Sequence, residues 1–314
     1  SEWKETYIGR LRKEWDVISL KDCTMKITDG THSTVKDDPS GEYFLLSCKN
    51  IKNGNIVLGE KERKINYETL LKLRLRTGLQ KDDILLTTVG TIGESAIIKE
   101  ENIDFELQRS VAIIRANPEI LLPDFLYYVT KSRIFKSQAD GLVRGSVQKC
   151  LFIGAIGEIK IPVPSLKEQE KIVDILSSLD DKIELNNEMN KTLEEMAQSI
   201  FKRWFVDFEF PNEDDQSYKS SGGEMVESEL GMIPKGWEVK ELGEVININP
   251  RESLKKGEEK IYVEMANLPL NYARITNYIE KPFNGGTKFR NGDTLLARIT
   301  PCLENGKTAI VDFL

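Results

Sequence analysis

The chain has 314 residues, of which 39% are hydrophobic and 30% charged, and its formal net charge is −7. This length leaves room for two domains, each with a hydrophobic core of its own. The sequence has no run of 18 apolar residues and no signal peptide at its first residues, so we expect a cytoplasmic protein that does not contact a membrane. The four cysteines form no C-x-x-C pair, which argues against zinc sites and disulfide frameworks.

Charge is unevenly distributed along the chain. Residues 61–81 contain seven Lys and Arg against two Glu, whereas residues 207–229 contain eight acidic residues and one Lys. The acidic total is therefore partly a property of the later segment. The first part of the chain can present a basic face to phosphates although the whole chain is anionic, and a merely solvated surface is the alternative.

Residues 1–162 are predicted to form a mixed α/β domain. Apolar and β-branched runs at 43–46, 83–88 and 111–114 predict strands between turn-rich stretches, and a helix is expected near residues 124–138. Prolines at positions 162 and 164 end this domain, because proline cannot continue a strand ladder. Ser165 followed by Glu168 is the pattern of a capping box that starts the next helix.

One long helix is predicted from Leu166 to about Trp204, within a spacer that spans residues 163–208. Apolar or amide residues recur there in alternating steps of four and three, which is the repeat of a coiled-coil seam. The seam consists of Ile172, Leu176, Leu179, Ile183, Asn186, Asn190, Leu193, Ala197, Ile200 and Trp204. Such a helix is roughly 60 Å long. Because the two amides on the seam are satisfied in only one register, we expect pairing with one particular helix.

The sequence after the long helix repeats motifs from its beginning. Residues 209–233 are acidic and rich in Ser and Gly, which predicts a flexible linker, and a second α/β domain is expected at 234–314. Trp15-Asp16-Val17 with Leu20 returns as Trp237-Glu238-Val239 with Leu242, and the segment 81–87 returns at 291–297. The two spacings differ by only about a dozen residues, as expected of homologous domains with diverged loops.

The second domain is expected to be incomplete. After Asp83 the first domain continues for about 80 residues, whereas only 21 residues follow the equivalent Asp293. We therefore expect a truncated gene product, or a recombined variant whose missing half comes from a second copy through pairing of residues 166–204.

The sequence contains no convincing catalytic motif. His32 is the only histidine, which excludes multi-histidine metal sites. An Asn-Pro-Pro-aromatic or Asp-Pro-Pro-aromatic tetrapeptide, the signature of adenine methylation, does not occur, since Asn249-Pro250 is followed by Arg251. We therefore expect a chain without catalytic residues, metal or cofactor of its own.

A standalone metal-dependent nuclease is the enzymatic alternative. It would use Asp124, Glu158 and Lys160, whose spacing fits a nuclease pattern only loosely. A nonenzymatic coiled-coil scaffold, which needs only the long helix, is a second alternative. Salt-dependent DNA affinity would argue against the scaffold.

Four segments together resemble the specificity subunits of type I restriction-modification enzymes, and the resemblance extends over essentially the whole chain. They are Pro162-Val163-Pro164-Ser165-Leu166-Lys167-Glu168-Gln169, Ile183-Glu184-Leu185-Asn186, Phe201-Lys202-Arg203-Trp204-Phe205-Val206-Asp207-Phe208 and Pro234-Lys235-Gly236-Trp237. In that family the first segment closes a target recognition domain, the next two belong to a long helix, and the last opens a second recognition domain.

The resemblance implies a noncatalytic, DNA-reading subunit of α/β (α+β) fold. It predicts one target recognition domain, a long coiled-coil helix and a second, incomplete recognition domain. Each recognition domain would read one half of a split target in double-stranded DNA. The expected protein partners are adenine methyltransferase subunits and the translocating restriction subunits, which would hold S-adenosylmethionine, ATP and Mg²⁺. A second copy of the chain is a further candidate partner, in which case each copy would read half of a symmetric target.

Candidate DNA contacts are polar and basic residues in loops rich in Thr and Gly, because such side chains reach phosphates and base edges. They are Thr31, His32, Lys49, Asn50, Thr88, Arg109, Arg144, Ser146, Gln148, Lys149 and Arg298. Residues 144–149 rank first, since their glycine lets the backbone approach a phosphate. Candidates for helix pairing and subunit docking are the seam residues named above, apart from Ala197.

Overall fold

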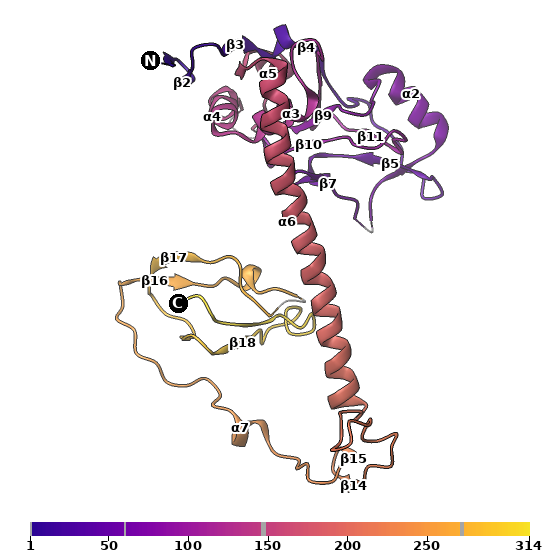
Figure 1. Ribbon diagram of the computed structural model, residues 1–314, viewed down its shortest axis with the longest axis vertical. Helices are drawn as coiled ribbons and strands as arrows, with labels where there is room; N and C mark the ends of the chain where they lie inside the picture. The colour runs from indigo at the N-terminus through magenta and orange to yellow at the C-terminus, as the bar shows by residue number, and fades with distance from the viewer. Residues whose placement is uncertain (1, 60, 146–148, 271–272) are drawn as a thin grey trace. The chain divides into compact units, whose positions relative to one another are not determined.

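The computed structural model describes residues 2–59, 61–145, 149–270 and 273–314 (Figure 1). The chain divides into two compact units, with the boundary between Glu184 and Leu185. The first unit contains a mixed α/β fold and the first half of a long helix. The second contains the rest of that helix and a series of β-hairpins.

A four-stranded antiparallel sheet forms the centre of the first unit. Its order is β10 (Ser95–Ile97), β9 (Ile84–Thr87), β12 (Val111–Ala116) and β4 (Thr24–Asp29). The inner strands are buried on both faces, so they consist of continuous apolar runs rather than alternating ones. Ile84 and Leu86 face one core cluster and Leu85 the other, as the two-residue period of a strand requires.

Two layers cover this sheet. On one face pack the helices α3 (Pro123–Lys131), α4 (Arg133–Leu142) and α5 (Ile153–Glu158). On the other lies a second sheet of order β11 (Phe105–Leu107), β5 (Tyr43–Leu46) and β8 (Lys64–Ile65), in which β11 and β5 are parallel. The predicted strands at 43–46, 83–88 and 111–114 are thus confirmed to within a residue or two at their ends.

The remaining elements of this unit are short. They are the hairpin β1 (Trp3–Thr6) with β2 (Gly9–Arg12), the pair β3 (Asp16–Ser19) with β13 (Lys160–Val163), the pair β6 (Ile51–Lys52) with β7 (Asn55–Ile56), and the helices α1 (Leu20–Cys23), η1 (Cys48–Asn50) and α2 (Tyr67–Thr77).

Two local predictions were wrong. The helix expected near residues 124–138 is two helices, because Ser132 adopts an extended conformation between them and its side chain caps α4. Pro162 does not end the strand ladder but pairs with Val17 inside β13. This is compatible with proline chemistry, because the two-stranded β3–β13 pair has free edges at which the missing N–H is tolerated.

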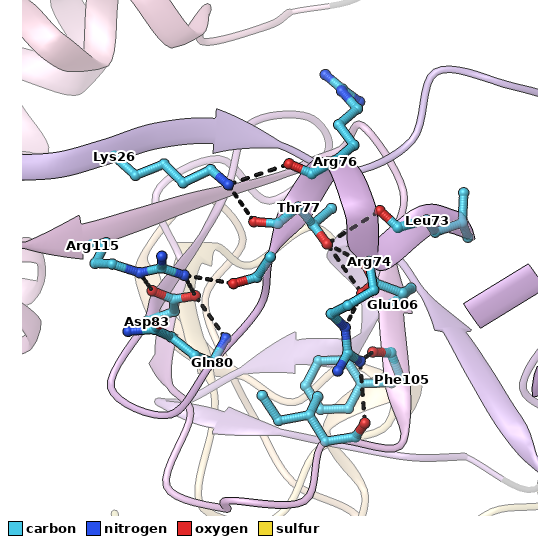
Figure 2. A network of polar contacts seen from close by, with 12 residues as sticks. Lys26, Leu73, Arg74, Arg76, Thr77, Gln80, Asp83, Phe105, Glu106 and Arg115 are labelled. Carbon is cyan, nitrogen blue, oxygen red and sulfur yellow. Dashed lines mark hydrogen bonds and ion pairs between the residues drawn. The ribbon is translucent and has the colours of Figure 1, made fainter. Parts of the chain in front are cut away.

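A polar network ties α2 to both sheets (Figure 2). The carboxylate of Glu106, fully buried on β11, accepts hydrogen bonds from the guanidinium of Arg74 and the hydroxyl of Thr77. Burial raises the pKa of Glu106, and the ion pair with Arg74 opposes that rise. Nearby, the buried carboxylate of Asp83 accepts from Nε and Nη2 of Arg115 at 2.7 and 2.8 Å. These paired charges fix α2 and the start of β9 in place.

The predicted long helix is confirmed as α6 (Leu166–Phe201), which has 36 residues and is followed by a π-helical turn, η2 (Lys202–Val206) (Figure 1). Its first turns are anchored to the first unit by Gln169. The side-chain oxygen of Gln169 accepts from the Leu122 N–H, and its side-chain nitrogen donates to the carbonyls of Ile120 and Pro164, all at 2.9 Å. Further along, the Tyr128 hydroxyl donates to Asp180 at 3.0 Å.

After η2, the described residues of the second unit form three hairpins and two single helical turns. They are β14 (Met225–Ser228) with β15 (Gly231–Pro234), β16 (Glu259–Tyr262) with β17 (Ile279–Pro282) and β18 (Thr294–Leu296) with β19 (Thr308–Ile310), together with α7 (Leu242–Val245) and η3 (Met265–Asn267). A small core of Leu268, Ile275, Ala297, Ala309 and Val311 holds the C-terminal part together.

The segment expected as a flexible linker, residues 209–233, is folded. The ring of Phe210 stacks on Tyr218 with centroids 4.7 Å apart and on Trp237 at 5.6 Å. The Asn212 side-chain oxygen accepts from the backbone of Asp214 and Gln216. Composition predicted a linker because Ser, Gly and acidic residues favour turns, but aromatic residues spaced along the same stretch provide a core for those turns.

The motif duplication corresponds to a structural repeat, whose first hairpin opens the chain in the first unit and follows α6 in the second. The hairpins β1–β2 and β14–β15 have the same register, with Trp3 opposite Arg12 in one and Met225 opposite Pro234 in the other. The Thr6 hydroxyl donates to Gly9 O at 2.6 Å, and the Ser228 hydroxyl donates to Gly231 O at 2.6 Å. The repeat therefore begins at β14, before the predicted domain start at residue 234.

The second pair of motifs repeats in the same way. In the first unit Ile98 N–H donates to Asp83 O at 3.0 Å, and in the second Val311 N–H donates to Asp293 O at 2.9 Å. The carboxylates of the two aspartates each accept from the backbone N–H three residues earlier, at 3.0 and 2.9 Å. The β9–β10 and β18–β19 hairpins are thus equivalent, as the sequence repeat predicted.

Candidate nucleic-acid interface

Four backbone segments of the first unit meet beside the ends of β4, β9 and β11. Thr31 N–H donates to Leu107 O at 2.7 Å and Arg109 N–H donates to Thr31 O at 3.0 Å. Thr88 N–H donates to Ser110 O, and Leu151 N–H donates to Thr88 O, both at 2.9 Å. A Cβ at Gly30 would lie 2.1 Å from Leu107 O, so only glycine permits this approach. The segments are therefore held rigidly against one another.

A hollow of about 310 Å³ lies where these segments meet. It is lined by Asp29, His32, Thr88, Val89, Gln108, Arg109, Ser110, Cys150, Leu151, Phe152 and Ile153. Three of the candidate DNA contacts, His32, Thr88 and Arg109, line it directly. The side chains come from segments that are far apart in the sequence, so the fold and not the local sequence brings them together.

His32 is held by an acidic partner at the rim of this hollow. Its Nε2 lies 2.7 Å from Asp29 Oδ2, and the other oxygen of Asp29 accepts from Arg76 Nη2 at 2.6 Å. A carboxylate can only accept, so the Nε2 that faces Asp29 carries a proton. Arg76 also donates to Gly30 O, which ties the pair to the backbone next to Asp29.

Of the predicted contact segment 144–149, the structure describes Arg144, Gly145 and Lys149, which precede Cys150 on the wall of the hollow. Arg144 and Cys150 exchange two backbone hydrogen bonds, of 3.0 and 2.8 Å, and Cys150 also forms a bridge with Val89. Arg144 and Lys149 are both exposed and pair with no acidic side chain of the described residues. Ser146 and Gln148, predicted as contacts, lie outside the described residues.

Lys49 and Asn50 lie on η1, whose first N–H donates to Ser110 Oγ at 3.1 Å. Lys49 is exposed and forms an ion pair with Glu62 at 2.9 Å. Asn50 does not fit the prediction of a DNA contact, because it is 1% exposed and its amide bonds the backbone of Ser47 and Val57. Because the Asn50 amide already bonds two backbone groups within a turn, it is not available to bond a base edge. Thr31, also buried, bonds Ser33 N–H through its hydroxyl.

The basic run at 61–81 is largely neutralised within the first unit. Ion pairs join Arg63 to Asp37, Arg74 to Glu106, Arg76 to Asp29 and Lys81 to Glu101. The cations of this run that form no ion pair with the described residues, and so remain for the predicted basic face, are Lys61, Lys64 and Lys72. Most cations of this run stabilise the fold instead.

Arg298, the remaining predicted contact, belongs to the second unit. The repeat of β9 in β18 places it at the position that Thr88 has in the first unit. Its side chain is exposed. The two units thus carry different polar groups at equivalent positions after the repeated strand.

The seam residues of α6 fall into two groups. Ile172 packs against the core of the first unit, and Leu176 is half-buried. The later ones are exposed, with Leu179, Ile183 and Leu193 each between 55 and 58% accessible, and Ile200, Trp204, Asn186 and Asn190 also exposed. The other helices of the described residues have at most 11 residues, so α6 has no long helix beside it there.

Residues of the nuclease alternative are engaged in ion pairs. Asp124 pairs with Lys99, and Glu158 pairs with Lys21 at 2.7 Å. Across the described ranges no three His, Cys, Asp or Glu side chains are grouped so that they could hold a metal ion. No helix among the described residues is long and apolar enough to span a membrane.

Phe152 was not predicted from the sequence. It precedes α5, lines the hollow and is 58% exposed, which is unusual for a large apolar side chain. Sequence patterns did not single it out, because one phenylalanine beside a short apolar run is typical of a core. Only the position of α5 against β4 exposes the ring at this site.

The chain is similar in sequence to a family of known proteins. A sequence model of the type I restriction modification DNA specificity domain matches residues 12–195. The MjaIX specificity subunit of a type I restriction enzyme from Methanocaldococcus jannaschii is 32% identical over 284 residues, which are 89% of this chain and 62% of that subunit. The HindI specificity subunit from Haemophilus influenzae is 32% identical over 139 residues, 43% of this chain and 30% of that subunit. The chain thus spans less than two thirds of either relative.

Among solved structures, the S subunit of a type I restriction-modification system from M. genitalium is 19% identical to the chain. The likeness covers 62% of this chain and 46% of that one, with a TM-score of 0.44. The family match covers more than half of the chain, including all of the hollow. The protein belongs to the family of type I restriction-modification DNA specificity domains.

Proposed function

We propose that this chain is the DNA-recognition subunit of a type I restriction-modification complex. It reads one half of a bipartite target with the first unit and docks adenine methyltransferase subunits, and restriction subunits in the full enzyme. The catalytic groups and the cofactors S-adenosylmethionine, ATP and Mg²⁺ belong to those partner subunits. The complex acts on double-stranded DNA in the cytoplasm.

One observation carries this proposal beyond family membership. A hollow with polar and apolar walls is lined by the exposed Arg109, and the exposed Arg144 and Lys149 lie on the segment that leads to its wall residue Cys150; none of the three makes an ion pair with the described residues. Unpaired cations beside a hollow suit phosphates that flank a base-reading surface. Elsewhere in this unit, most arginines are already neutralised by carboxylates, so the remaining cations are the natural phosphate contacts.

The long helix supports the bipartite part of the proposal. At 36 residues α6 is about 54 Å long, which exceeds the roughly 34 Å between successive turns of B-DNA on one face. A rigid helix of this length is suited to hold two reading units at a fixed spacing. Its exposed seam from Leu179 to Trp204 provides the apolar surface for docking.

A second copy of the chain is the second candidate partner for that seam. The exposed residues Leu179, Ile183 and Leu193 favour it, because a helix with this repeat can pair with itself. Two copies would read a symmetric target. Sedimentation velocity of the purified chain, with and without methyltransferase, distinguishes the two arrangements.

DNA binding is tested first by substitution of the exposed cations. Arg144→Ala and Lys149→Ala should each weaken binding to all duplexes, and each should lower the slope of log K against log salt by about one unit. Lys99→Ala is the matched control, because Lys99 already pairs with Asp124. Unchanged affinity in both loop variants would reduce residues 144–149 to a structural turn.

Methylation mapping tests the whole proposal. The chain together with its methyltransferase should modify adenines in one defined sequence, whereas the chain alone should neither methylate nor cut DNA. Methyl transfer from S-adenosylmethionine by the purified chain would refute a noncatalytic role. Cleavage of plasmid by the chain with Mg²⁺ would favour the nuclease alternative.

A further inference from the structure

The polar groups lining the hollow differ in how far their bonding capacity is already used. Thr88 Oγ1 donates to Arg109 O, and Ser110 Oγ accepts from Cys48 N–H. The Asp29 carboxylate is occupied by His32 and Arg76. These groups hold the walls together, so part of their hydrogen-bonding capacity is already used within the protein.

Gln108 is different. Its backbone is fixed, since its N–H donates to Leu46 O at 2.8 Å and it forms a bridge with Thr31. Its half-buried side-chain amide, however, makes no hydrogen bond to the described residues. The amide therefore offers both an N–H donor group and a carbonyl acceptor to a ligand in the hollow.

Phe152 supplies the only large exposed aromatic surface among the residues that line the hollow. Its backbone is also held, because Ile156 N–H donates to Phe152 O at 3.0 Å at the start of α5. The hollow therefore combines a donor–acceptor pair with an apolar face, and Arg109 adds an unpaired cation at the rim.

This combination matches one base pair better than the others. In the major groove adenine presents N7 as an acceptor and N6 as a donor, which the side-chain amide of Gln satisfies in a bidentate manner. The paired thymine presents a methyl group, which packs on apolar side chains such as Phe. Guanine has two acceptors there and calls for Arg or Lys, and cytosine presents a donor that calls for a carboxylate.

We infer that Gln108 and Phe152 are specificity-determining residues that read an A·T pair in the half-site bound by the first unit. Gln108 bonds the adenine edge and Phe152 packs on the thymine methyl group, while Arg109 and Lys149 contact phosphates. The inference rests on the proposed DNA-reading function and deepens it by naming the base pair and the side chains that read it.

The test starts from the full chain together with the methyltransferase and a library of random-sequence duplexes. Wild type should select a consensus that contains an A·T pair. Gln108→Met, which keeps the side-chain volume but removes the amide, should lose the preference at that one position and bind the consensus about 5- to 150-fold more weakly. Gln80→Met, at an exposed glutamine of the same unit, is the matched control and should select the wild-type consensus.

Modified bases test the contacts without relying on any variant's stability. Replacing the adenine by 7-deazaadenine should weaken binding of wild type but not of Gln108→Met. Replacing the thymine by uracil, which lacks the methyl group, should weaken wild type but not Phe152→Ala. The loss of each penalty in the matching variant identifies the contact, as in a double-mutant cycle.

Three outcomes would overturn the inference. The first is a Gln108→Met variant that selects the full wild-type consensus, and the second is a wild-type protein whose binding is unchanged by both modified bases. The third is a Gln108→Met variant that loses its preference at a G·C position of the consensus rather than at an A·T position, which would assign the reading to Arg109. If wild type selects no sequence at all, the proposed function itself fails, and that result is distinct from the other three.

Discussion

Gln169 is the best position at which to test how the long helix is fixed to the first unit. It is fully buried and makes three hydrogen bonds, to Leu122 N–H and to the carbonyls of Ile120 and Pro164. Gln169→Met keeps the volume and the helix propensity but leaves one donor and two acceptors, all buried or part-buried, without a partner. At about 1 kcal/mol for each lost bond, the free energy of unfolding should fall by about 3 kcal/mol.

The effect should be visible both globally and locally. For a unit of this size, about 3 kcal/mol corresponds to a fall in Tm of roughly 6 to 12 °C in a thermal unfolding scan of the full chain. Hydrogen exchange of the Leu122 amide should accelerate strongly, because the side-chain oxygen of Gln169 is its acceptor.

Gln198→Met is the matched control, since Gln198 lies on the exposed part of the same helix and should change stability by less than about 0.5 kcal/mol. The reasoning is refuted if Gln169→Met melts within 2 °C of this control, or if protection of the Leu122 amide is unchanged. Either result would show that the hydrogen bonds of Gln169 do not fix the helix to the first unit.

Three further predictions concern the core and the helix seam. Arg115→Met should cost about 3 to 5 kcal/mol in a urea titration, because it leaves the buried carboxylate of Asp83 without its bidentate partner, and a loss below 1 kcal/mol would contradict this. Burial raises the pKa of the Cys23 thiol to about 11, so the reactive thiolate is scarce below that pH. Alkylation of Cys23 at about pH 8 should therefore require unfolding, and rapid labelling of Cys23 in the native protein would contradict this prediction. Replacing Asn186 and Asn190 together by Leu should raise thermal stability and produce additional oligomers in sedimentation velocity, because the amides no longer select one register. A double variant that is less stable and still forms one uniquely paired species would show that the two amides do not lie on the seam.

Features that depend on local periodicity were readable from the sequence. The alternation of three and four residues predicted α6 to within a few residues of its observed end at Phe201. The repeated motifs predicted two equivalent hairpins, which the matching hydrogen bonds of Asp83 and Asp293 confirm. The helix periodicity and the repeated motifs are both visible in the sequence because the geometry of a helix or a hairpin requires particular residue types at particular spacings.

The candidate site was predictable only in part. Loop composition pointed to His32, Thr88 and Arg109, and the fold brings all three to one hollow. Composition also pointed to Asn50, whose amide is buried in a turn. Residue type predicts what a side chain can bond, but it does not reveal whether the backbone has already used that capacity.

The sequence alone determined the long helix, the repeated hairpins and the polar character of the loops, because each follows from neighbouring residues. Only the tertiary structure decided which charges remain for a partner. Arg74 and Arg76 lie in the most basic segment, yet Glu106 and Asp29 neutralise them from strands that are distant in the sequence. The fold likewise brings Phe152 and Gln108, which are distant in the sequence, to the walls of one hollow. Pairing energies act over a few ångströms in space, and the residue order does not specify which distant residues come within that range.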